Sequence, residues 1–222
     1  MAERTAKKPS LEAILVLTAF AAGSVDVIAF AKLGGILCSA MTGNLAFLGF
    51  YIGRSAVASA IGSGIALIGY IIGSAAGTLI SRGMDQLPAL RALLGVEAML
   101  LGGAAALWHF TPHRLGSSTG DGVVALMAVS MGLQSITGKR VNLSSIPTVV
   151  FTSTLTNIVI GMTDTLAGKG KKLPQDTKRQ VASFLMYFAG ALSTGYAVYR
   201  FWGGLIYMPV SAGVLAFLSL LF

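Results

Sequence analysis

Two short polar clusters interrupt long apolar stretches, and they hold the residues best suited to contact a solute. The first stretch, 36–53, contains Thr42, Gly43 and Asn44 between apolar flanks; the second, 147–161, contains Thr152, Thr154, Thr156 and Asn157. Hydrocarbon offers no water to backbone or amide groups, so such a break persists only when it is buried in protein or lines a watery cavity. Hydroxyl and amide groups there could replace the hydration of a small anion or a neutral polar solute.

Each break has two interpretations. If a break begins a half-helix, its free N–H groups and the positive end of the helix dipole point toward the middle of the bilayer, where they favour an anion or a polar solute. In the alternative, the Thr and Asn side chains only cap that helix end. We favour pathway lining, because two symmetric breaks exceed what a single helix kink requires.

Two carboxyl groups, those of Asp26 and Glu97, are the only ones of the eight acids well inside expected membrane spans. A charge at that depth is costly, so such a residue usually faces a cavity or a partner. Either group could serve as a proton or cation site, and the alternative is a carboxyl group held by Ser, Thr or Asn across a helix interface. Gln134, also inside an expected span, joins the candidate pathway residues.

Enzyme chemistry finds no support in the sequence. It has no Ser/His/Asp set, no metal-spaced cluster, no nucleotide-binding glycine loop and no Walker motif. Cys38 is the single cysteine, which excludes an internal disulfide and a thiolate metal site. We therefore expect no enzymatic activity, no cofactor and no metal.

The composition places these residues in a membrane. Hydrophobic residues make up 55% of the chain and charged residues 11%, against about 25% charged in soluble domains. The 222 residues leave no room for a soluble domain beside the spans, so we predict a single all-α integral membrane domain, 1–222. The net charge of +8 is better explained by orientation in the membrane than by nucleic-acid binding.

The apolar runs give the elements that must position the candidate residues. A helix needs about 20 residues to cross the hydrocarbon core. We predict full spans at about 11–30, 57–81, 92–110, 123–138, 181–199 and 203–222, with 82–91, 111–121 and 169–179 as loops.

The two halves of the chain, 11–110 and 122–222, match one another. Gly23-x-x-Asp26 corresponds to Gly132-x-x-Ser135, Thr42-Gly43-Asn44 to Leu155-Thr156-Asn157, and Gly73-x-x-x-Gly77 to Ala191-x-x-x-Gly195. If both breaks are re-entrant or broken-helix segments, twelve of the sixteen basic residues fall on one side, against ten if all eight segments cross. We favour six full spans plus two broken segments, arranged as two inverted repeats.

A third feature is the glycine row Gly69, Gly73 and Gly77, which places a groove on one helix face. It serves either intramolecular packing, which we favour, or a homodimer seam.

The motifs together resemble the YoaK family of uncharacterised bacterial inner-membrane proteins. The resemblance covers nearly the whole length and rests on residues 22–26, 41–44, 132–134, 139–140 and 154–157. The chain departs from the family pattern at four positions: Ala40 replaces a frequent histidine, Ser153 a glycine, Ser135 an asparagine and Pro147 an arginine. The resemblance implies a multi-span membrane protein and names no substrate.

We predict a permease for a small polar solute in the bacterial inner membrane, with the N-terminus and basic loops cytoplasmic. The two breaks would form its central site, with proton coupling through Asp26 or Glu97. One alternative is a passive channel of the same architecture. Another is a non-transporting protein that assembles with a partner through the glycine row. The expected partners are therefore lipid, a small polar solute, protons and, in the last case, a second copy, with no nucleic acid.

Overall fold

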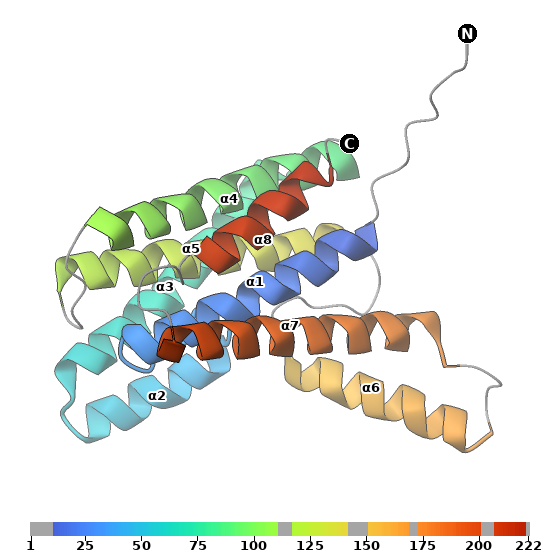
Figure 1. The fold of residues 1–222 in the computed structure, drawn as a ribbon, viewed down its shortest axis with the longest axis horizontal. Helices are drawn as coiled ribbons and strands as arrows, with labels where there is room; N and C mark the ends of the chain where they lie inside the picture. The colour runs from blue at the N-terminus through green and yellow to red at the C-terminus, as the bar shows by residue number, and fades with distance from the viewer. Residues whose placement is uncertain (1–10, 111–116, 142–150, 169–172, 201–206, 221–222) are drawn as a thin grey trace, which may run out of the picture.

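The computed structural model describes residues 11–110, 117–141, 151–168, 173–200 and 207–220, and every regular element in these ranges is a helix. The helices are α1 Leu11–Lys32, α2 Met41–Gly53, α3 Val57–Ile80, α4 Gln86–Phe110, α5 Ser118–Arg140, α6 Phe151–Leu166, α7 Gln175–Arg200 and α8 Tyr207–Leu218. The long helices run roughly along one axis of the molecule (Figure 1). The predicted all-α membrane fold is confirmed.

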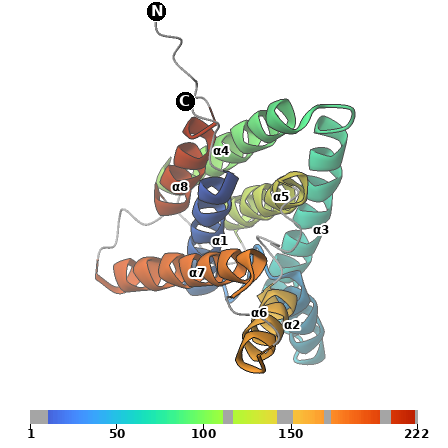
Figure 2. The same ribbon diagram turned by 90° about the vertical axis from the view of Figure 1, so that its right-hand side faces the viewer.

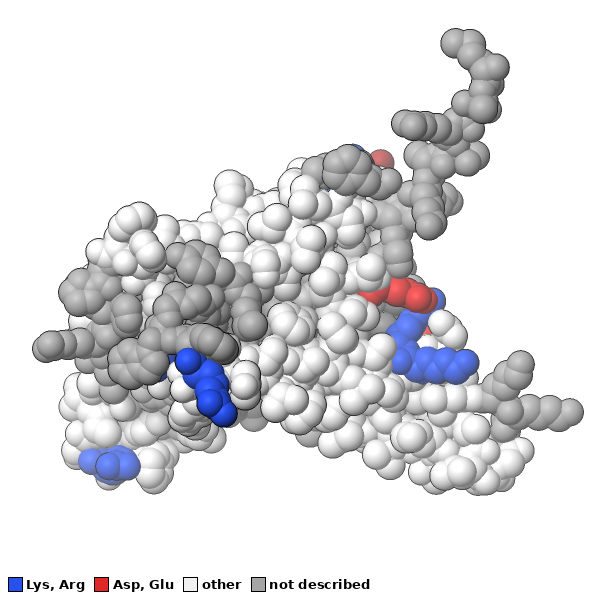
Figure 3. Space-filling view, viewed as in Figure 1, with Lys and Arg blue, Asp and Glu red and all other residues white. Residues whose placement is uncertain are grey.

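Five helices, α1, α3, α4, α5 and α7, are long and apolar enough to cross a membrane. The sixth predicted span, 203–222, contains α8, which has 12 residues within the described part of the chain. Its complete crossing therefore stays a prediction. Viewed from the side shown in Figure 3, charged side chains lie toward the two ends of the long axis and the band between them is uncharged. This distribution suits a bundle whose axis crosses the bilayer.

Three helices begin earlier than predicted. The loop expected at 82–91 ends at Gln86, where α4 begins, because Pro88 lies in the first turn, where a missing N–H costs nothing. Helix α5 begins at Ser118 rather than 123, since the Ser117 hydroxyl accepts the Gly120 N–H at 3.1 Å and caps it. Helix α7 begins at Gln175 rather than 181.

Helices of one half pack chiefly on helices of the other. Helix α1 lies against α7 and α8, while α5 lies against α3 and α4; α2 packs on α3, and α6 on α7. Exchanging α1 with α5, α2 with α6, α3 with α7 and α4 with α8 leaves this scheme unchanged. Each helix also runs opposite to its counterpart along the long axis (Figure 1).

Glycines allow the two closest helix crossings, and they do so in matching ways. A Cβ on Gly23 would collide with the Tyr187 carbonyl oxygen, and one on Gly190 with that of Phe20. At the crossing of α5 and α3, a Cβ on Gly132 would collide with the Tyr70 carbonyl oxygen, and one on Gly73 with the Val129 carbonyl oxygen. The structure thus aligns Gly73 with Gly190, one residue from the Ala191 expected from the sequence.

The glycine row is occupied within the chain. Gly69, Gly73 and Gly77 all face α5, and Gly73 lies on its backbone. Intramolecular packing is therefore the role of this row, and it leaves no room there for a partner helix.

Within the described part of the chain, helices α2 and α6 are shorter than a helix that crosses the bilayer. With 13 and 16 residues, they are about 20 and 24 Å long, against a hydrocarbon core of about 30 Å. Their first turns face each other below α1 and α7, and they diverge toward opposite ends of the molecule (Figures 1 and 2).

Candidate functional site

The first chain break is the connection between α1 and α2, residues 33–40. Two glycines with positive φ follow the end of α1, Gly34 at 92° and Gly35 at 76°. The Gly35 N–H donates to the Phe30 carbonyl at 3.0 Å, which closes the helix end. The break thus precedes Thr42, Gly43 and Asn44, which form the first turn of α2 rather than an interruption within it.

Asp26 holds this connection from the side of α1. Its Oδ1 accepts the backbone N–H groups of Cys38 at 2.8 Å and Ser39 at 2.7 Å. Its Oδ2 accepts the Ser39 hydroxyl at 2.5 Å and the Tyr187 hydroxyl at 2.7 Å. The side chain is 2% exposed. All four acceptor positions that a carboxylate normally offers are therefore used by protein groups.

Asn44 holds the same connection from the side of α2. Its Oδ1 accepts the Leu37 N–H at 2.9 Å, and its Nδ2 donates to the Leu37 carbonyl. The residue is fully buried. The side-chain amide thus bonds to both the N–H and the carbonyl of Leu37, in the way that the backbone of a neighbouring β-strand would.

The two side chains together satisfy the N–H groups of Leu37, Cys38 and Ser39, three residues in a row. An irregular backbone in a bilayer requires such partners, because no water replaces them. The geometry therefore gives Asp26 and Asn44 a positioning role, and we call them with Ser39 and Tyr187 the break clamp.

Tyr187 is the member that sequence reasoning missed. It comes from α7, 161 residues from Asp26, and joins the two halves at this point. Nothing in its local sequence marks it, since it lies among the other apolar and aromatic residues of a span. Ser39 and Cys38 lie inside the predicted stretch 36–53, but the sequence does not show that their backbone N–H groups bond to Asp26.

The second break carries more exposed polar side chains than the first. On α6, Thr154 is buried against the bundle, whereas Thr156 and Asn157 are exposed, as is Thr42 on α2. Gly43 is partly exposed. The side chain of Thr152 and residues 142–150, including Pro147, lie outside the described part of the chain.

Gln134 and Glu97 lie apart from the break clamp. Gln134 is buried on α5, and its Nε2 donates to the Thr18 carbonyl of α1 at 2.8 Å, which links the two central helices. Glu97 lies on the buried face of α4 and is 0% exposed, and neither carboxyl oxygen has a hydrogen-bond partner among the described residues. In the described ranges no group of His, Cys, Asp and Glu side chains is arranged to hold a metal ion.

Comparison with known proteins places the chain in a family. The family described as "Protein of unknown function (DUF1275)" matches residues 14–221. The chain belongs to the DUF1275 family. This DUF1275 chain is also 30% identical over 205 residues to the UPF0700 transmembrane protein YoaK of Bacillus subtilis (strain 168), which covers 89% of the chain and 88% of that relative. No solved structure matches it.

The resemblance to the YoaK family expected from the motifs is thereby confirmed. The DUF1275 chain is a transmembrane protein of this family. Two of the resemblance-bearing residues, Asp26 and Asn44, prove to be members of the break clamp. Others, Thr156 and Asn157, stay exposed at the start of α6.

Proposed function

We propose that the protein is a permease for a small polar solute, built from two inverted repeats in the inner membrane. One observation carries the proposal: two short helices begin opposite each other, and Thr42 in the first turn of α2 and Asn157 in the second turn of α6 are exposed. Polar side chains at that depth require water, a solute or a protein partner. The exchange symmetry of the packing and the reversed helix directions support the inverted repeat.

The two facing helix starts favour a particular class of solute. Both present the positive ends of their dipoles to the same region, and no acid lies in the first turn of either helix. A monovalent anion or an uncharged polar molecule suits this field, whereas a cation does not. Alternating access would then be a movement of the α1–α7 pair against the α3–α5 pair, because each of these interlocked pairs joins one helix from each half of the chain.

Charge distribution supports the orientation. Contacts place the starts of α1, α4 and α7 and the ends of α3, α5 and α8 at one end: Arg179 pairs with Glu12, Arg140 with Ser81, and Arg91 with the Leu220 carbonyl. This end, which we call the basic end, carries six described Lys or Arg residues: Arg82, Arg91, Lys139, Arg140, Lys178 and Arg179. The opposite end carries three: Lys32, Arg54 and Arg200. The positive-inside bias therefore makes the basic end, with the N-terminus, cytoplasmic.

Glu97 is the carboxyl group we assign to proton coupling. Asp26 has four hydrogen-bond donors and a structural task, whereas Glu97 has no hydrogen-bond partner among the described residues. A carboxyl group can exchange a proton with least disturbance where no other group depends on its charge.

Cysteine accessibility tests the pathway without knowledge of the solute. In a Cys38→Ser background, a membrane-impermeant thiol reagent should label both Thr42→Cys and Asn157→Cys, while Ile160→Cys, also exposed on α6, should stay unlabelled as a lipid-facing control. Protection of both polar positions would refute the pathway. Disulfide-linked dimers of Asn157→Cys would instead show that a second copy covers this face.

Flux into proteoliposomes separates a carrier from a channel. Light scattering after osmotic shock with urea, glycerol or formate reports entry of each probe. A carrier should saturate with probe concentration, and Asn157→Leu should abolish entry while the matched variant Val159→Leu leaves it unchanged. Equal entry through empty vesicles and proteoliposomes for every probe would leave the permease without support.

A further inference from the structure

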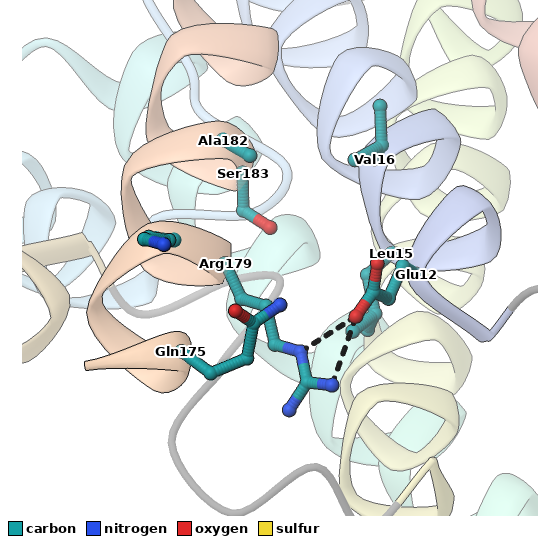
Figure 4. Close-up of a pocket in the computed structure, with 8 residues that line it drawn as sticks. Glu12, Leu15, Val16, Gln175, Arg179, Ala182 and Ser183 are labelled. Atoms are coloured by element: carbon teal, nitrogen blue, oxygen red, sulfur yellow. Dashed lines mark hydrogen bonds and ion pairs between the residues drawn. The ribbon is translucent and has the colours of Figure 1, made fainter. Parts of the chain in front are cut away.

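A cleft opens at the basic end, between the first turns of α1 and α7. Its volume is about 230 Å³. The walls are apolar, from Leu15 and Val16 on α1 and Ala182 on α7 (Figure 4). The polar lining comes from five side chains: Glu12, Gln175, Lys178, Arg179 and Ser183.

Ser183 is the buried polar side chain of this cleft. Its side chain points from α7 into the space between the helices (Figure 4), the residue is 1% exposed, and its Oγ has no hydrogen-bond partner among the described residues. Buried hydroxyl groups usually have a partner, so this one calls for an explanation, which a ligand oxygen in the cleft would supply.

Arg179 faces the same cleft and pairs with two partly exposed acids, Glu12 and Asp176. Its Nε and Nη2 both contact a single oxygen of Glu12, at 2.9 and 2.8 Å, and its Nη1 contacts Asp176 at 3.3 Å. Partly exposed pairs of this kind contribute little stability. A tetrahedral anion with several oxygens could therefore replace Glu12 as the partner of the guanidinium fork.

We propose that this cleft binds a phosphate group, with Arg179, Lys178, Gln175 and Ser183 as donors and Glu12 as the competing internal anion. The donors are all of types that bind phosphate oxygens, and they surround a space with apolar walls. That combination matches a phosphodiester with an attached hydrocarbon at the cytoplasmic membrane surface, where basic pockets between helices bind lipid headgroups. Free phosphate could accept the same hydrogen bonds, but it has no hydrocarbon to pack against the apolar walls.

Native mass spectrometry of the full-length protein in detergent tests the site. Phosphatidylglycerol, phosphatidylcholine and inorganic phosphate serve as separate probes. Arg179→Gln should weaken phosphatidylglycerol binding on the order of tenfold, and Ser183→Ala by about threefold to tenfold. Glu12→Gln should strengthen it, because the internal competitor is removed. Lys139→Gln, which removes the same charge from an exposed position at the same end, should leave binding unchanged.

The pattern across variants decides the outcome. Binding of phosphatidylglycerol alone assigns the site to a lipid, and matching changes with inorganic phosphate assign it to a free anion. Equal weakening by Arg179→Gln and Lys139→Gln would overturn the proposal, since it would show attraction to surface charge only. Unchanged binding in Glu12→Gln would also overturn the proposal. Because this variant is expected to bind more tightly, misfolding cannot imitate the expected result.

Discussion

Replacing Asp26 by asparagine or by alanine separates the two tasks that a buried carboxyl group can have. In the asparagine variant, the amide oxygen can take the place of Oδ1 and keep the N–H groups of Cys38 and Ser39. The amide nitrogen then lies where Oδ2 was, beside the hydroxyls of Ser39 and Tyr187. Because a hydroxyl can accept as well as donate, both contacts survive with their direction reversed.

The expected cost of each variant follows from this geometry. Asparagine loses only the extra strength of bonds to a charge, about 1 kcal/mol per bond, and part of that loss is offset because an uncharged amide is cheaper to bury. We expect a net loss of about 1–2 kcal/mol. Alanine leaves two backbone N–H groups without an acceptor, at about 1–3 kcal/mol each, so the loss should be about 2–6 kcal/mol.

Cys38 provides the assay, because it is the single cysteine of the chain, is fully buried and belongs to the clamped connection. A dye that fluoresces on reaction with a thiol should report a melting curve in detergent that is slightly lowered for Asp26→Asn and strongly lowered for Asp26→Ala. Asp85→Asn, at an exposed acid, controls for the loss of charge.

Two results would refute this reasoning. Asp26→Ala melting like the wild type would show that the connection does not depend on the carboxylate, and Asp26→Asn melting as low as the alanine variant would show that the charge itself is required. A folded Asp26→Asn variant that still transports would also remove Asp26 from any proton-coupling role.

Three further pairs of substitutions test the packing and the buried groups by the same melting assay. Asn44→Leu should lower stability by about 2–4 kcal/mol, because a backbone N–H and a carbonyl lose their partners, whereas Asn157→Leu at an exposed position should not; equal curves would contradict the clamp. Gly190→Ala should cost about 1–3 kcal/mol by forcing α7 from α1, while Gly195→Ala, whose Cβ would make an ordinary 3.8 Å contact, should be tolerated; the reverse order would contradict the crossing. Glu97→Gln should change stability by less than about 1 kcal/mol because no hydrogen bond is lost, whereas Glu97→Lys should cost about 3–5 kcal/mol by burying an unpaired charge; a large loss in the glutamine variant would reveal a missing partner.

Much of the fold could be predicted from apolar runs and glycine spacing. The five long helices coincide with apolar stretches that are long enough to cross the hydrocarbon core of a bilayer. The starts of α4 and α7 were misplaced because polar and charged first turns at a membrane surface resemble loops in sequence. Gln86 shows this well: it opens α4, yet its side chain reaches the carbonyls of Arg140 and Val141.

The break clamp could be predicted only in part. Asp26 and Asn44 were identifiable, because a polar side chain inside a membrane span needs hydrogen-bond partners. Their partners were not, because Leu37 and Cys38 contribute only backbone N–H groups and Tyr187 arrives from the far half of the chain. Composition also cannot tell whether a side-chain amide is buried and bonded to nearby backbone, as in Asn44, or exposed on the helix surface, as in Asn157.

The exchange of helices between halves bears on how the protein is made. When the ribosome has released only the first four helices, α1 still lacks α7 and α8, and the Tyr187 hydroxyl that completes the Asp26 carboxylate has not been synthesised. Helix α3 likewise lacks α5, which packs on its glycine row in the complete protein. The amino-terminal portion therefore remains incomplete in the bilayer until the last portion of the polypeptide inserts. Quality-control proteases acting on truncated chains would meet an α1 that lacks its α7 and α8 neighbours and an Asp26 that lacks its Tyr187 donor.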